Sequence, residues 1–442
     1  MKVGFISLGC SKNLVDTEMM IGLFKNNKFE ITKNPEEAEI IVVNTCGFID
    51  SAKKEAIDTI LEMADYKHNN CKLLVATGCM VQRYKDELLK ELPEVDLFIS
   101  IDEYNEFWKI IEKEINKVMP PVSIFKEIIQ DYDSLNYLNR EISTSGYYAY
   151  LKIAEGCSNN CTYCAIPKIR GKYVSRDFNE IIKEAQNLSD KGLEEIIVIA
   201  QDTTKYGIDL YGKPRLAELL RELCKMNFKW VRFLYAYPES VTDELIEVVK
   251  NEEKIVNYFD MPIQHINDRV LKRMARRTTG AQIREKIQKI RREIPNVVMR
   301  TSLIAGFPGE SEEEFEELKA FVKEIRFDRL GCFAYSKEDG TPAEKLDGHL
   351  LKSIKTKRAN EIMKIQKDIS LENNKRLIGT TLDVLIENIT DDGKYYIGRS
   401  YREVPEDTDG VIYVENTKDL IIGNFYDIKI IDAMEYDLIG TI

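Results

Sequence analysis

Strand-like and helix-like segments alternate six times between residues 146 and 374, and this order constrains the fold more than any other feature. The strand candidates are short runs rich in aliphatic and aromatic residues, over residues 150–154, 195–200, 230–236, 258–262, 297–304 and 329–335. Helical patterns separate them, over residues 178–191, 216–226, 242–250, 269–275, 281–294 and 313–325. Six strand–helix units predict an open, partial (β/α) barrel, and a charged helix over 352–374 follows it.

The regions on either side of this alternation predict two further domains, so the fold class is α/β multidomain. Residues 1–120 carry four strand candidates (2–8, 39–44, 72–77 and 96–100) between helical patterns (14–26, 52–66, 82–91 and 106–117), which predicts a small parallel sheet. After residue 375 short strands (381–387, 395–400, 410–414 and 427–431) alternate with turn residues, which predicts a small antiparallel β-barrel. The expected domains are 1–120, a linker over 121–145, 146–374 and 375–442.

Length and charge narrow the class of protein. A chain of 442 residues, 31% of them charged, is expected to form two or three domains. It contains no leader-like segment and no apolar run of eighteen residues, so we expect a cytoplasmic protein with no membrane contact. The net charge of −12 argues against a generic nucleic-acid binder and favours a basic protein partner or a small-molecule substrate.

Three of the nine cysteines stand within eight residues, directly after the first strand of the predicted barrel. Cys157, Cys161 and Cys164 have the spacing Cys-x-x-x-Cys-x-x-Cys, at the end of a barrel strand where such folds place their active sites. Three thiolates can hold three irons of a [4Fe–4S] cluster and leave the fourth iron open to another ligand. A structural zinc site is the alternative, but it needs four ligands, usually in two short-spaced pairs. Chance spacing is a second alternative.

This segment resembles the signature of the radical S-adenosylmethionine (SAM) superfamily, and Tyr163 matches the aromatic residue usual before the last cysteine. The resemblance implies that the open iron binds SAM and that reduction cleaves SAM to methionine and a deoxyadenosyl radical. It also implies a reducing partner such as flavodoxin or ferredoxin.

A second set of cysteines, Cys10, Cys46 and Cys79, is spread along the N-terminal region. Each follows a predicted strand and stands beside small residues. Parallel strands end at one edge of their sheet, so these thiols are expected to converge there. The alternative is three buried cysteines that act as small apolar residues. Cys71, Cys224 and Cys332 are not expected to bind iron.

The two cysteine sets together resemble the methylthiotransferase family of radical enzymes, and the resemblance covers nearly the whole chain. It implies two [4Fe–4S] clusters, one held by Cys157, Cys161 and Cys164 and an auxiliary one held by Cys10, Cys46 and Cys79. The auxiliary cluster supplies or carries sulfur for insertion into an unactivated C–H bond, and SAM supplies the methyl group. The last domain corresponds to the β-barrel called TRAM.

The family contains a branch that modifies a tRNA adenosine and a branch that modifies an aspartate of a small-subunit ribosomal protein. Four stretches resemble the ribosomal-protein branch: residues 7–16, 200–204, 234–238 and 262–265. Charge points the same way, because residues 375–442 contain seven Lys and Arg against fourteen Asp and Glu, a net charge of −7. A tRNA-binding barrel should present cations to phosphates, whereas an acidic barrel suits a basic protein. The acidity could also serve solubility alone.

The resemblance further implies that Gln201 binds the cofactor, with Asp202 beside it, and that Gly306 and Gly309 lie near bound SAM. For the glycines we favour a structural role at a helix start, because Ser311 and Glu314 form a capping-box pattern, and any cofactor contact would be through the backbone. The basic run at 272–277 could bind a carboxylate, but a solvated helix face is the commoner explanation. His265 is a minor candidate, and no catalytic residue is assigned.

The sequence therefore predicts an enzyme that adds a methylthio group to the β-carbon of an aspartate in the twelfth small-subunit ribosomal protein. A tRNA adenosine methylthiotransferase is the alternative, and a non-catalytic iron–sulfur electron carrier is a rival of a different class. No nucleic-acid partner is expected other than through the ribosome.

Overall fold

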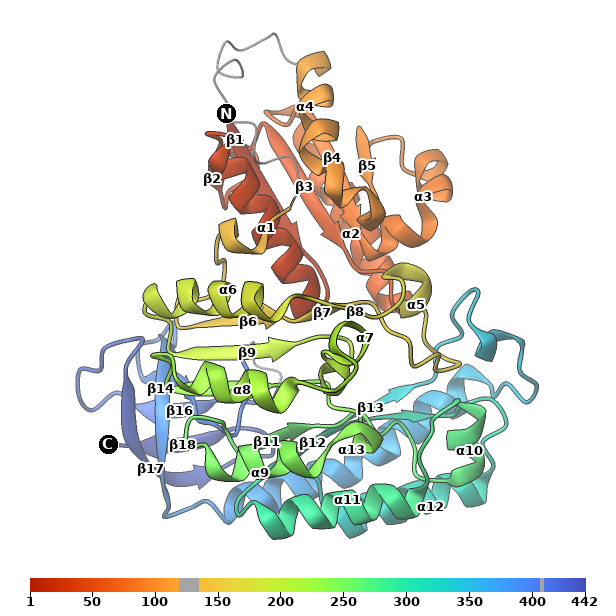
Figure 1. Ribbon diagram of the computed structural model, residues 1–442, viewed down its shortest axis with the longest axis vertical. Coiled ribbons are helices and arrows are strands. Elements are labelled where there is room, and N and C mark those ends of the chain that lie inside the picture. Colours follow the sequence, from red (N-terminus) through yellow and green to blue (C-terminus); the bar gives the residue numbers. More distant parts are fainter. Residues whose placement is uncertain (119–134, 406–408) are drawn as a thin grey trace.

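The computed structural model describes residues 1–118, 135–405 and 409–442, which form three parts (Figure 1). The N-terminal part lies at the top of the view, the second part below it, and the C-terminal barrel at the lower left. Most of the expected linker at 121–145, including its start, lies outside the described residues. Among the helices described, none is long and apolar enough to cross a membrane.

The N-terminal part is a five-stranded sheet in the order β2-β1-β3-β4-β5, with all strands parallel. Its strands are β1 (Lys2–Ser7), β2 (Glu30–Thr32), β3 (Ile40–Thr45), β4 (Leu73–Gly78) and β5 (Leu97–Ile99). Its helices are α1 (Ser11–Asn26), α2 (Asp50–Asp65), α3 (Cys79–Glu91) and α4 (Phe107–Val118). The sequence predicted this parallel sheet but not β2, which has only three residues, none of them buried.

The second part contains the six predicted strands. They form two three-stranded parallel sheets, β6-β9-β10 and β11-β12-β13. A bridge between Val231 and Ile255 and a hydrogen bond from the Ala236 amide to Asp260 O (2.9 Å) connect the two sheets. The strands are β6 (Tyr148–Lys152), β9 (Glu195–Ile199), β10 (Trp230–Phe233), β11 (Tyr258–Asp260), β12 (Val298–Ala305) and β13 (Arg329–Ala334). The helices that follow them are α6 (Phe178–Asp190), α8 (Leu216–Cys224), α9 (Asp243–Asn251), α10 (Asp268–Arg273), α11 (Gly280–Glu293), α12 (Glu312–Ile325) and α13 (Lys352–Lys375). The result is the expected partial (β/α) barrel.

The C-terminal part is a closed five-stranded barrel in the order β14-β15-β16-β18-β17. Its strands are β14 (Thr381–Ile389), β15 (Tyr395–Arg399), β16 (Ile412–Glu415), β17 (Phe425–Ala433) and β18 (Leu438–Thr441). Its pairs are antiparallel except for β16 with β18, which closes the barrel in parallel. The sequence analysis missed β18, a four-residue strand near the end of the chain.

The C-terminal barrel packs against the ends where the partial-barrel strands begin. Glu195, the first residue of β9, is fully buried and pairs with Arg232 (2.7 Å) and with Arg399 of β15. Trp230, at the start of β10, packs edge-on against Phe425 with ring centroids 4.7 Å apart. Since catalytic loops of such barrels lie at the opposite ends of the strands, this barrel braces the fold away from Cys157.

Glu195 gives a direct test of that buried contact. Changing Glu195→Gln should destabilise the protein by about 3–5 kcal/mol, because two guanidinium groups would be left buried without their shared carboxylate. Burial works against ionisation, but the two arginines outweigh it and hold the pKa of Glu195 below its ordinary value of 4.5. The difference in stability between the wild type and the variant should therefore be complete above pH 4.5 and should shrink as the pH falls below that value. Calorimetric melting at pH 7 and at acid pH measures both effects, with the half-buried Glu194→Gln as control; equal melting of the two variants would contradict the account.

Candidate functional site

The Cys157–Cys164 loop follows β7 (Ala154–Glu155) and is held at several points by backbone contacts. Gly156 has φ +70°, which favours glycine, and a side chain there would collide with the carbonyl of Lys172. The Cys157 amide donates to Gly171 O (3.1 Å). Thr162 donates through its amide to Met274 O (3.0 Å) and through its hydroxyl to Arg273 O (2.8 Å). The loop is therefore fixed before any ligand binds.

The thiols of Cys157 and Cys164 lie close enough to Cys161 for its charge to act on them. Burial, together with the neighbouring Cys161 and Cys157, raises the pKa of Cys164 to about 12. Burial likewise raises the pKa of Cys157, with Asp202 and Cys161 adding to it. Iron in a cluster would compensate the negative charge of the thiolates at Cys157 and Cys164.

The cysteines of the N-terminal part also converge, as predicted from their positions after strands. Cys10 caps the start of α1, Cys46 directly follows β3, and Cys79 directly follows β4 as the first residue of α3. All nine cysteines are free of disulfides. Burial is the main cause that raises the pKa of Cys79 to about 12, and both Cys10 and Cys46 raise it further.

Two glycines allow this close approach. A Cβ on Gly9 would lie 2.9 Å from the Sγ of Cys46, and a Cβ on Gly47 would lie 2.6 Å from the Cα of Met80, the residue after Cys79. Asn13 joins the same edge, because its Nδ2 donates to Leu8 O (3.0 Å) and Thr45 O (2.9 Å). The thiol of Cys79 donates to the Oδ1 of Asn13 (3.3 Å). Asn13 lies in the stretch 7–16 that resembles the ribosomal-protein branch, but its role beside the thiols was not predicted.

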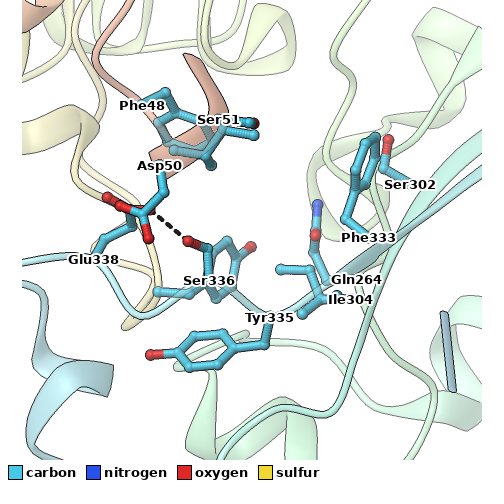
Figure 2. A pocket seen from close by; sticks show the side chains of 13 residues that line it. Phe48, Asp50, Ser51, Gln264, Ser302, Ile304, Phe333, Tyr335, Ser336 and Glu338 are labelled. Carbon is cyan, nitrogen blue, oxygen red and sulfur yellow. Dashed lines mark hydrogen bonds between the residues drawn. The ribbon is translucent and has the colours of Figure 1, made fainter. Parts of the chain in front are cut away.

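A cavity of about 570 Å³ lies between the two parts that carry the cysteines. Figure 2 shows Phe48, Asp50 and Ser51 on one side of it, while Gln264, Ser302, Ile304 and Phe333 lie on the other and Tyr335 below. Phe48 stands two residues after Cys46, and Tyr163, which also lines the cavity, stands between Cys161 and Cys164. The wall of one largely apolar space therefore includes a residue close to Cys46 and a residue of the Cys157–Cys164 loop.

Two residues of the radical domain, one of which lines the cavity, hold unusual backbone conformations. Gln264, which lines the cavity, has φ +75°, and Tyr235 has φ +62°, in the left-handed region that residues with a Cβ adopt only at a cost. Such strain collects at functional sites. The Nζ of Lys12, two residues from Cys10, lies 3.3 Å from the centroid of the Tyr235 ring. Tyr235 and Gln264 belong to two of the stretches that resemble the ribosomal-protein branch, 234–238 and 262–265.

The three expected cofactor-binding residues have different environments. Gln201 donates to Glu155 (3.1 Å), two residues from Cys157, and its Oε1 is buried without a hydrogen-bond partner among the described residues. Gly306 has φ +74°, and a side chain there would meet Lys355 of α13. The Gly309 amide donates to Gly348 O (2.8 Å). Neither glycine lines the cavity, and Ser311 with Glu314 forms the capping box of α12.

The minor candidates are mostly structural. His265 is fully buried, and its Nδ1 accepts from the Asn267 amide (3.1 Å). In the basic run at 272–277, Arg276 does not fit a solvated face, because its side chain is fully buried and stacks on Tyr237 at 4.2 Å. The Tyr237 hydroxyl lies 3.7 Å from the Sγ of Cys161. Sequence reasoning missed this support of Cys161, since it depends on a tertiary contact.

Each cysteine set offers three thiols, the donor type of an iron–sulfur cluster. Among the described residues, no group of three or more His, Cys, Asp or Glu side chains could hold a metal ion as they stand. A [4Fe–4S] cluster is bulkier than one ion, so its thiolates lie further apart. Three thiols on each side, with small residues allowing close approach, fit that larger group.

Comparison with known proteins agrees with this geometry. The Radical SAM superfamily matches residues 151–322, the uncharacterized protein family UPF0004 matches 2–100, and the TRAM domain matches 378–442. The fold is similar to two solved radical SAM structures, the methyltransferase TsrM from Kitasatospora setae (TM-score 0.55, 11% identity, covering 86% of this chain and 77% of that one) and the cobalamin-dependent enzyme OxsB (TM-score 0.50, 12% identity, covering 83% and 56%). The fold and the Cys157–Cys164 loop thus define a radical SAM enzyme, a class that implies one [4Fe–4S] cluster and SAM.

Closer relatives identify the family. Proteins named ribosomal protein uS12 methylthiotransferase RimO are 58% identical in Alkaliphilus oremlandii, 50% in Acetivibrio thermocellus and 51% in Clostridioides difficile. The matches cover 100% of this chain and 98–99% of the relatives. The chain belongs to the RimO methylthiotransferase family.

Proposed function

We propose that this protein adds a methylthio group to the β-carbon of an aspartate of ribosomal protein uS12 by radical SAM chemistry. The observation that carries the proposal is a cavity lined by Phe48, two residues after Cys46, and by Tyr163, which stands between Cys161 and Cys164. A substrate carbon in that space would lie beside residues that neighbour both cysteine sets. The names of the full-length relatives supply the substrate.

The proposed ligands follow the two cysteine sets. Cys157, Cys161 and Cys164 would hold the radical [4Fe–4S] cluster, and Cys10, Cys46 and Cys79 the auxiliary one. Three protein ligands leave one iron of each cluster open. When bound, the clusters and SAM supply a carbon-centred radical, a sulfur atom and a methyl group.

The residues of the chain position the reactants and exclude water. Tyr237 contacts Cys161 and is stacked on Arg276. The Oε1 of Gln201, which has no hydrogen-bond partner among the described residues, would accept a hydrogen bond from the amino group of SAM. Phe333 and Tyr335 give the cavity apolar walls, which would shield a radical from side reactions with water.

The outer surface of the C-terminal barrel is acidic. Two further acids of this part, Glu403 and Asp409, form ion pairs with Arg329 and Arg300 of the radical domain. The exposed acids of the barrel are Asp391, Asp392, Asp419, Asp427 and Asp432. Such a surface attracts a basic protein and repels nucleic-acid phosphates. We further propose that the protein acts in the cytoplasm, where a ribosomal protein is made, and that a flavodoxin or ferredoxin supplies its electrons.

Incubating the reconstituted enzyme with SAM, a reductant and either uS12 or tRNA tests the proposal. We expect mass spectrometry to find a methylthio group on one aspartate of uS12 and none on tRNA. A methylthio adenosine in tRNA with unchanged uS12 would overturn the substrate assignment. Failure to form deoxyadenosine from SAM would instead favour a non-catalytic electron carrier.

A further inference from the structure

Arg170 extends from the radical domain to the cysteine set of the N-terminal domain. It directly follows the short helix α5 (Ile166–Ile169), only six residues after Cys164. Its side chain is 1% exposed, and its Nη2 lies 3.5 Å from the Sγ of Cys79 and 2.5 Å from the Oδ1 of Asn13. One domain thus contributes a cation to the thiol site of the other.

Acidic residues from both domains keep this cation in place. The guanidinium pairs with Asp16 of α1 (2.8 Å) and with Glu155 of the radical domain (3.0 Å). Lys152 pairs with the same two carboxylates. Two cations and two anions balance, so removing Arg170 would leave one uncompensated negative charge beside Cys79.

The backbone next to Arg170 contacts the other cysteine set. Gly171 O accepts the hydrogen bond of the Cys157 amide (3.1 Å), and the carbonyls of residues 170–172 crowd the space where a Cβ on Gly156 would lie. Arg170 and Gly171 are adjacent residues, so one dipeptide touches Cys79 through a side chain and Cys157 through a carbonyl.

We propose that Arg170 is a positioning residue that couples the two cysteine sets, with its N–H donating to the Cys79 thiolate of the auxiliary cluster. This inference rests on the proposed function, which assigns Cys79 as a ligand. A thiol at Cys79 can donate to Asn13, but a thiolate ligand can only accept. Of these two contacts, only the one with Arg170 would suit a thiolate ligand.

The coupling has an electrochemical consequence. Hydrogen bonds to cluster sulfurs and nearby charge set the reduction potential of an iron–sulfur cluster. Reduction adds negative charge, which the Arg170 cation stabilises. Losing that cation should make the auxiliary cluster harder to reduce and shift its midpoint potential to a more negative value.

The test uses the full chain with Cys157, Cys161 and Cys164 all changed to alanine, so that only the auxiliary set can hold iron. That parent should bind about four irons. On this background, Arg170→Gln should lower the midpoint potential measured by an EPR-monitored redox titration. Arg170→Lys keeps the positive charge but loses the planar guanidinium group. The midpoint potential of this variant should therefore lie between those of the parent and of Arg170→Gln.

Arg176→Gln is the matched control, because Arg176 is another nearly buried arginine of the radical domain, and its guanidinium pairs with Glu184 and donates to Lys152 O rather than to a thiol. Its potential should equal that of the parent. An unchanged potential in Arg170→Gln, or an equal shift in Arg176→Gln, would overturn the inference while leaving the proposed function intact. Loss of iron in Arg170→Gln, with iron kept in Arg170→Lys and Arg176→Gln, would support it. A parent without iron would overturn both the inference and the auxiliary ligand assignment.

Discussion

Changing Cys79→Ala should abolish methylthio transfer to uS12 while cleavage of SAM to deoxyadenosine continues. Cys79 belongs to the set that we assign to the auxiliary cluster, and a thiol ligand cannot be replaced by a methyl group. The radical loop at Cys157–Cys164 lies in another domain and stays intact. Loss of the small buried Cys79 side-chain sulfur should cost about 1 kcal/mol of folding stability, too little to unfold the protein. Liquid chromatography of deoxyadenosine and mass spectrometry of uS12 measure the two reactions separately.

Cys71→Ala is the control for this variant, because Cys71 is a buried cysteine of the same domain that lies outside the converging set. It should retain both reactions. If Cys79→Ala still modified uS12, the assignment of Cys10, Cys46 and Cys79 to sulfur insertion would be wrong.

Changing Cys161→Ala should eliminate deoxyadenosine formation and methylthio transfer together. With two thiols left, the loop cannot hold the cluster that binds and reduces SAM. The N-terminal cysteine set is untouched, so the protein should still bind about half of its iron. A single-turnover assay with dithionite as reductant measures deoxyadenosine formation and methylthio transfer. An iron determination on the same protein measures the bound iron.

Cys332→Ala is the matched control in the radical domain. Cys332 lies in β13, outside the loop, and should be dispensable for both reactions. Deoxyadenosine formation by Cys161→Ala would show that the radical chemistry does not depend on this loop.

Local patterns and strand order predicted much of the fold. The convergence of Cys10, Cys46 and Cys79 followed from their positions after parallel strands, since such strands end at one edge of the sheet. The strands β2 (EIT) and β18 (LIGT) were missed because they hold only one and two large apolar residues, too few to form an apolar run.

The residues that support the site could not be predicted in this way. Arg170 and Cys79 are 91 residues apart, and only the packing of two domains brings them into contact. Arg276 reads as part of a charged helix end, yet it is buried against Tyr237 because the loop carrying Cys161 folds over it. The cavity itself forms from Phe48 of one domain and Tyr335 of another, and no sequence window contains both.

The central claim is that two cysteine sets in different domains each hold a [4Fe–4S] cluster beside one cavity. Iron and sulfide determination on anaerobically purified wild-type protein tests it most directly. The account predicts about eight irons and about eight sulfides per chain. About four of each would contradict it, because one cysteine set would then hold no cluster.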